Sequence, residues 1–220
     1  TDLTASDTNT TDLTDFVPPP LAPSRMIPWD EGRFRSNPYH SEKEHYQALT
    51  TILNQTQGEE RVIQTLKESG LKGMGGAGFP TGVKWELVRN QPGHPKYVVV
   101  NADESEPGTF KDRALLEYFP HLVIEGMLIA AHCVGSHLAI IFIRHEYGHE
   151  KERMLAAIRK AEDRGLLTLV PLKQLLDHQN PEQNSLLEDK RDESLVEVSL
   201  FVSPGGYILG EETALLEALE

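Results

Sequence analysis

Residues 120–165 read PHLVIEGMLIAAHCVGSHLAIIFIRHEYGHEKERMLAAIRKAEDRG, and this stretch decides the fold. Its first part predicts a helix over 120–134, because proline is favoured in the first turn of a helix. The apolar run 138–143 predicts a buried strand, and the spacing of apolar residues over 148–164 predicts an amphipathic helix. Residues 97–100 form another short apolar run upstream. Strands that alternate with helices in this way indicate a parallel sheet, so we expect the α/β class.

The flanking sequence divides the chain into parts of different character. Residues 1–20 are rich in Thr and Asp and end in consecutive prolines, which predicts a disordered tail. Residues 21–70 contain apolar patterns at helical spacing and predict a short helical N-terminal region. Residues 71–220 predict the main domain, in which 172–202 resembles an insertion. The helical pattern that begins at Gly210 has no capping signal at its end, so we expect a domain incomplete at its C-terminus.

The composition excludes several classes of protein. A net charge of −13 repels phosphate backbones, so nucleic-acid binding is not expected as the main function. The single cysteine, Cys133, excludes an internal disulfide and a zinc or iron–sulfur centre built mainly from this chain's cysteines. No apolar run approaches the ~20 residues that cross a bilayer, and the first residues lack the features of a secretory signal.

The glycine-rich loop over 73–78, Gly-Met-Gly-Gly-Ala-Gly, formally matches the GxGxxG pattern. An ordinary Rossmann motif is disfavoured, because a helix rather than a strand precedes the loop. Glycines let a backbone approach a planar or phosphorylated ligand closely, and Lys84 on the same segment could offset a phosphate charge. On these residues alone, a nucleotide-contacting loop and a flexible surface linker both remain open.

A polar cluster lies directly after the predicted strand at 97–100. It comprises Asn101, Asp103, Glu104 and Glu106, at the position where open α/β sheets bind ligands. The carboxylates could accept hydrogen bonds from ligand hydroxyls or hold a hard cation. Asn and Asp are also common in solvated turns, so a structural interpretation stays open.

Two further segments allow both a functional and a structural interpretation. Residues 206–213, GYILGEET, place an aromatic side chain beside two adjacent acids at the start of a predicted helix, where acids also act as simple caps. Residues 145–149, HEYGH, match the HExxH signature of zinc proteases. That motif needs both histidines on one helix, whereas this segment directly follows the predicted strand 138–143. We therefore expect no metal site there.

Three segments taken together resemble the FMN-carrying, NADH-oxidising subunit of respiratory complex I. They are residues 70–85 (GLKGMGGAGFPTGVKW), 100–113 (VNADESEPGTFKDR) and 206–215 (GYILGEETAL). Diaphorase subunits of NAD-linked hydrogenases and formate dehydrogenases share this pattern, and the resemblance covers roughly residues 40–220. The related ferredoxin–NAD oxidoreductase subunits share only the glycine loop. The resemblance implies an atypical Rossmann-like FMN-binding domain with a parallel sheet, preceded by the short helical region.

The resemblance also implies a role for each motif. The glycine loop would pack under the flavin and the dinucleotide, with an aromatic side chain on the adenine and a lysine near phosphate or flavin. The acidic cluster would bond FMN and the nicotinamide side, and the tyrosine segment would complete the pocket. The implied cofactor-binding residues are Gly73, Gly75, Gly76, Gly78, Phe79, Lys84, Asn101, Asp103, Glu104, Glu106, Tyr207, Gly210, Glu211 and Glu212. No catalytic side chain is required, because hydride transfer is the chemistry of the cofactor.

The implied function is an FMN-dependent NADH dehydrogenase subunit that sends single electrons to iron–sulfur clusters and towards quinone. Its implied partners are NADH, a thioredoxin-like 2Fe–2S subunit and the large iron–sulfur subunit, in a cytoplasmic complex peripheral to the membrane and without a span of its own. A 4Fe–4S cluster is expected only in a later part of family chains. Met74 stands where the family usually has Arg, and Leu87 where it often has an aromatic residue. The alternative is a truncated, non-catalytic remnant that acts as a binding or assembly module.

Overall fold

The computed structural model describes residues 38–177 and 195–219. Their centre is a four-stranded sheet in the order β1-β2-β4-β3, in which all neighbouring strands are parallel. The strands are β1 (Tyr97–Ala102), β2 (Leu138–Ile143), β3 (Leu167–Leu169) and β4 (Val196–Val202). The predicted α/β class and parallel sheet are confirmed, and β2 has the bounds expected from its apolar run.

Helices connect the strands and precede the sheet. They are η2 (Glu42–Glu44), α1 (Gln47–Leu53), α2 (Gly58–Ser69), α3 (Thr81–Arg89), α4 (Lys111–Tyr118), α5 (Pro120–Val134), α6 (Gly148–Asp163), α7 (Leu172–Asp177), η3 (Tyr207–Gly210) and α9 (Glu212–Leu219). Helix α5 begins at Pro120 and ends before Gly135, as its sequence predicts. Short helices occupy residues 42–69 of the helical region predicted over 21–70, and residues 1–37, which include the predicted disordered tail at 1–20, lie outside the described residues.

The strand β2 organises the core because it is buried on both faces. Successive side chains of a strand point to opposite faces, so its six residues divide between two apolar clusters. Ala139, Ile141 and Ile143 belong to the larger cluster, whereas Leu138, Ile140 and Phe142 belong to the smaller one. A strand that is apolar throughout therefore lies in the middle of the sheet, as is typical of parallel sheets.

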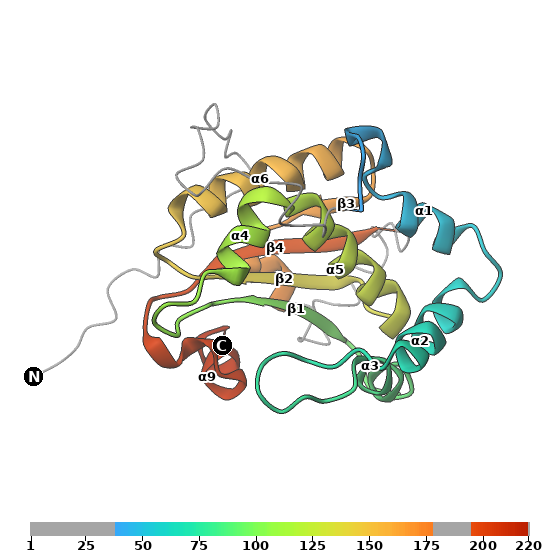
Figure 1. Ribbon diagram of the computed structural model, residues 1–220, viewed down its shortest axis with the longest axis horizontal. Helices are drawn as coiled ribbons and strands as arrows, with labels where there is room; N and C mark the ends of the chain where they lie inside the picture. Colours follow the sequence, from blue (N-terminus) through green and yellow to red (C-terminus); the bar gives the residue numbers. More distant parts are fainter. Residues whose placement is uncertain (1–37, 178–194, 220) are drawn as a thin grey trace, which may run out of the picture.

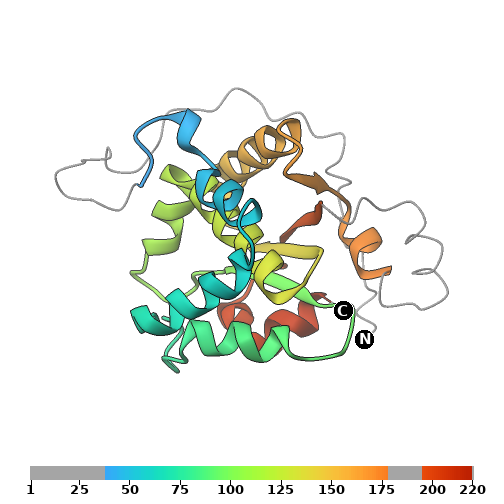
Figure 2. The same ribbon diagram turned by 90° about the vertical axis from the view of Figure 1, so that its right-hand side faces the viewer.

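Helices cover both faces of the sheet (Figure 1). The larger cluster joins the sheet to α4, α5 and α6, and the smaller cluster joins it to α7 and α9. Helices α2 and α3 pack together beyond β1, and the view in Figure 2 places them on the same side of the molecule as α9. Figure 1 places both the α2–α3 loop and α9 below β1.

Some elements differ from the expectations. Helices α3 and α4 and the short strand β3 were not predicted, because glycine or acidic residues interrupt the patterns around them. The predicted insertion at 172–202 is wrong at its C-terminal end, since residues 196–202 form β4 and pair with both β2 and β3. The acidic sequence just before β4 made the insertion look longer than it is: the pattern from Ser199 is strand-like, and the strand begins at Val196. Residues 178–194 lie outside the described part.

Within the two described ranges, no single helix is both long and apolar enough to cross a membrane. The helices α4 and α5 satisfy the test only when they are taken together, and they are bent by 98° at the break between them.

Candidate functional site

The candidate site begins at the carboxyl end of β1, where Asn101 joins two segments that are distant in sequence. Its side-chain Nδ2 donates to the carbonyl oxygen of Gly210 at 2.8 Å, and its Oδ1 accepts from the backbone N–H of Asp103 at 3.2 Å. The end of the strand is thereby tied both to its own loop and to the last residue of η3. The acidic cluster and the tyrosine segment, which the sequence placed in one pocket, therefore do lie together.

Gly210 is required at this junction because the backbone passes directly beside Asp103. A Cβ added at Gly210 would lie 2.7 Å from the carbonyl oxygen of Asp103, closer than real Cβ contacts come. Any side chain at position 210 would force the two backbones apart. The glycine, rather than a side-chain contact, thus sets how closely η3 approaches β1.

Asp103 contributes a buried carboxylate to this junction, since the residue is only 8% exposed. The hydroxyl of Ser105 donates to Oδ1, whereas Oδ2 is buried and has no hydrogen-bond partner in the described part of the chain. A buried carboxylate oxygen without a partner is costly. A ligand hydroxyl or amide that donated to Oδ2 would remove this cost.

Glu106 and Tyr207 face each other across the site from exposed positions. The hydroxyl of Tyr207 donates to the carboxylate of Glu106, although 101 residues separate the two in sequence. This hydrogen bond contributes most to the raised pKa of Tyr207, so the phenol stays protonated and remains a hydrogen-bond donor. Because Tyr207 is 67% exposed, its ring is available to a planar ligand.

Two of the predicted acids are already engaged by helix N-termini. One carboxylate oxygen of Glu104 accepts from the backbone N–H groups of Asp112 and Arg113 at 3.0 and 3.2 Å, and so caps α4. Glu211 caps α9 in the same way, through the N–H groups of Thr213 and Ala214. Those backbone bonds hold the pKa of Glu211 below its usual value. The capping interpretation is therefore confirmed for Glu211, whereas Glu212 is exposed in the first turn of α9.

The glycine loop is closed at its base and open along its length. The N–H of Gly73 donates to the carbonyl of Phe79, and the N–H of Thr81 donates to that of Leu71, both at 2.9 Å. A Cβ added at Gly75, Gly76 or Gly78 would meet no atom within 4 Å, so the loop leaves free space around its backbone. In Figure 1 the loop projects below β1, on the same side of the sheet as α9.

The side chains that flank this loop are also accessible. Phe79 is 48% exposed and Lys84, in α3, is exposed as well. Among residues 38–177 and 195–219, Lys84 takes part in no ion pair. Such a lysine and open backbone N–H groups can together receive a phosphate.

The two histidines of the HExxH segment lie in different local environments. His145 lies in the loop before α6, with its ring against Gly205 and its Nδ1 2.9 Å from Glu146. His149 lies within α6 and pairs with the buried Glu117 at 3.0 Å. The two rings thus have separate partners, and no group of three candidate metal ligands occurs within the described ranges.

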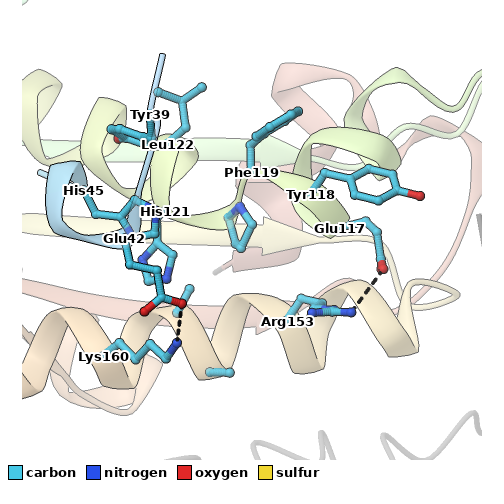
Figure 3. A pocket seen from close by; sticks show the side chains of 13 residues that line it. Tyr39, Glu42, His45, Glu117, Tyr118, Phe119, His121, Leu122, Arg153 and Lys160 are labelled. Carbon is cyan, nitrogen blue, oxygen red and sulfur yellow. Dashed lines mark ion pairs between the residues drawn. The ribbon is translucent and has the colours of Figure 1, made fainter. Parts of the chain in front are cut away.

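A separate cavity of about 260 Å³ lies where α4, α5 and α6 meet η2 (Figure 3). Its polar walls are largely self-paired: Arg153 reaches Glu117 at 3.6 Å, and Lys160 reaches Glu42 at 3.8 Å. It contains none of the residues of the three sequence motifs. We therefore place the candidate site at the end of β1 and not in this cavity.

Comparison with known proteins gives one family and consistent relatives. Residues 66–220 match the Nuo51 FMN-binding domain family. The chain is 43% identical over 177 residues to an NADH-quinone oxidoreductase subunit of Rhodobacter capsulatus, and the match covers 80% of this chain and 36% of that protein. It is 39% identical over 200 residues to the corresponding oxidoreductase subunit of Streptomyces coelicolor, covering 91% of this chain and 40% of that one.

A solved structure supports the same relationship. An NAD+-reducing NiFe hydrogenase in the H2-reduced state superposes with a TM-score of 0.62 at 30% sequence identity, over 80% of this chain and 26% of that one. The chain thus spans little more than a third of the length of the curated relatives quoted above.

Proposed function

Because the chain belongs to the Nuo51 FMN-binding domain family, we propose that its folded part binds FMN at the carboxyl end of β1 and presents it to NADH. The observation that carries this proposal is the buried Oδ2 of Asp103, which lacks a partner among the described residues at the point where the acidic cluster and the tyrosine segment meet. A ligand rich in hydroxyl groups, such as the ribityl chain of FMN, would satisfy this oxygen.

Other residues of the three motifs fit the rest of such a ligand. The open part of the glycine loop, with Gly75, Gly76 and Gly78, offers backbone N–H groups without side chains in front of them, and Gly73 closes the base of the loop through its bond to Phe79. Lys84 offers an exposed positive charge for a phosphate. Phe79 and Tyr207 offer exposed rings for planar groups. The donor set therefore suits a phosphorylated, hydroxylated and planar compound.

The chemistry that FMN supplies when bound is acceptance of a hydride from NADH and release of electrons one at a time. This chain's own contribution is binding and orientation. Asn101 and Gly210 fix the distance between β1 and η3. The hydrogen bond between Glu106 and Tyr207 links the loop after β1 to the first residue of η3. Glu104 and Glu211 shape the backbone there through the helix N-termini that they cap. Glu212 adds exposed negative charge beside them.

This negative charge supports a preference for NADH. Glu106, Glu211 and Glu212 are exposed near the site, and they would repel the additional 2′-phosphate of NADPH. We propose in addition that the electrons leave towards iron–sulfur subunits of a larger assembly peripheral to a membrane, and finally towards quinone. The support for this step is that relatives named as NADH-quinone oxidoreductase subunits are 43% and 39% identical to this chain over most of its length.

An anaerobic reduction experiment tests the proposal. The purified chain is loaded with FMN, freed of unbound flavin and mixed with NADH or NADPH while the flavin absorbance is followed. We expect NADH to bleach the bound flavin and NADPH to do so at least ~10-fold more slowly, the effect of about 1.4 kcal/mol of repulsion. The Asp103→Asn variant should retain less FMN, whereas Glu117→Gln, whose side chain lines the separate cavity, should retain as much as the unchanged chain.

The same experiment separates the enzyme from a non-catalytic binding module. Retention of FMN without bleaching by NADH would favour the module, which is the second candidate. Failure to retain any FMN would contradict the proposed FMN site and leave only a module that assembles with partner subunits.

A further inference from the structure

The loop over 103–109 carries the acids of the proposed site, yet it has little apolar packing to hold it. Residues 106–110 are all exposed, and the loop borders an open hollow of about 400 Å³. The far wall of this hollow is formed by Arg113, Arg144, Glu146 and Tyr147. The shape of the loop must therefore depend on polar contacts to this wall.

Arg144 is the first of these contacts. It follows β2 directly, and its guanidinium donates to the carbonyl oxygen of Glu104 at 2.6 Å. The same guanidinium is held by both carboxylate oxygens of Glu146, at 2.6 and 2.9 Å. A guanidinium fixed by a bidentate carboxylate has a defined orientation, so its remaining donor holds the Glu104 peptide in one place.

Tyr147 is the second contact, and it acts on the Glu104 side chain. Its hydroxyl donates to the same carboxylate oxygen that caps α4, at 3.2 Å, and the residue is only 7% exposed. Burial raises the pKa of Tyr147 most, and the negative charge of Glu104 raises it further, so the hydroxyl stays protonated and remains a donor. Arg113 stacks over the tyrosine ring at 5.9 Å and is itself anchored by the buried Glu150 at 2.7 Å.

We propose that Arg144 and Tyr147 are positioning residues for the ligand at the end of β1, acting through the backbone and carboxylate of Glu104. Together they fix the loop that carries Asp103 and Glu106, and neither residue needs to touch the ligand. Part of the HExxH-like segment thereby receives a role that has nothing to do with metal. This inference rests on the proposed function, because the ligand is FMN.

Two measurements on the full chain test the inference. The first is amide hydrogen exchange in the absence of ligand, which reports the loop directly. The second is titration with FMN, followed by quenching of flavin fluorescence. The variants are Tyr147→Phe and Arg144→Gln. The matched control is Tyr46→Phe, which also removes a hydroxyl contact of a buried tyrosine, here to His121 at 2.7 Å.

We expect Tyr147→Phe and Arg144→Gln to speed exchange over residues 104–113 and to weaken FMN binding about fivefold or more, the size of one hydrogen bond. Tyr46→Phe should lower thermal stability without either effect. In a Glu104→Gln background, Tyr147→Phe should change FMN affinity less than ~2-fold, because both substitutions act on one contact.

The inference is overturned if exchange over 104–113 is unchanged in both variants, or if Tyr46→Phe weakens FMN binding as much as they do. Failure of the unchanged chain to bind FMN would instead sink the proposed function. The exchange measurement would still show whether Arg144 and Tyr147 hold the loop, so the two failures are distinguishable.

Discussion

Substitution of Gly210 by alanine tests the close junction between β1 and η3. The new Cβ would lie 2.7 Å from the carbonyl oxygen of Asp103, and ordinary contact begins at 3.4 Å. The backbones must therefore separate by roughly 0.7 Å before the contact becomes attractive. Because β1 is held in the sheet by its pairing with β2, the displacement should fall on η3 and α9.

The expected cost follows from two losses. Overpacking of this size costs about 1–3 kcal/mol, and the 2.8 Å bond from Asn101 to Gly210 contributes about 1 kcal/mol more. We expect the free energy of unfolding in urea to fall by about 2–4 kcal/mol. FMN affinity should fall at least ~10-fold, because Asp103 Oδ2, which has no hydrogen-bond partner among the described residues, lies at the same junction.

Gly126→Ala provides the control for this experiment. Gly126 lies within α5, and an added Cβ there would meet no atom within 4 Å. Alanine should stabilise the helix by about 0.5–1 kcal/mol and leave FMN binding unchanged. If Gly210→Ala were as stable as the unchanged chain and bound FMN equally well, the junction would not set the geometry of the site.

Other predictions concern groups away from the site. Burial raises the pKa of Cys133 to about 12. Iodoacetamide at pH ~8, near the pKa of an ordinary thiol, should therefore label Cys133 only after the chain unfolds. Rapid labelling of the native chain would contradict this burial. Burial, and to a smaller extent the neighbouring His45, lowers the pKa of His121 to about 4, below its value in the unfolded chain. The free energy of unfolding should therefore fall as the pH drops from about 6.5 towards 4. An NMR titration midpoint of His121 near 6.5 would contradict this lowered pKa. Glu125 accepts from the N–H of Leu49 at 3.0 Å and from the hydroxyl of Tyr39, so Glu125→Gln should lower the urea unfolding free energy by about 1.5–3 kcal/mol, and a loss below ~0.5 kcal/mol would show that these bonds contribute little.

The sequence predicted the centre of the fold well because its signals are local. Helix α5 has a proline at its start and a glycine after its end, and β2 is apolar throughout, so both have the expected bounds. The residues of β4 were assigned to an insertion, and their place in the sheet depends on pairing with β2 and β3, which are distant in sequence.

The candidate site was predictable as a set of segments but not as a set of contacts. The resemblance implied that the acidic cluster and the tyrosine segment border one pocket, and the structure joins Asn101 to Gly210 and Glu106 to Tyr207. Sequence spacing gave no sign that Glu104 caps α4, because the capped N–H groups lie eight and nine residues further along. The segment around Tyr147 had been noticed only for its likeness to a zinc motif, and its contact with Glu104 depends on the packing of α6 beside α4.

The most direct measurement is a calorimetric titration of the ligand-free chain with FMN, with riboflavin as the comparison. The account predicts saturable binding of one FMN per chain and at least ~10-fold weaker binding of riboflavin, because Lys84 and the glycine loop would lose the phosphate. Absence of saturable heat with FMN, or equal affinity for the two compounds, would contradict the claim that this loop and the end of β1 form a flavin nucleotide site.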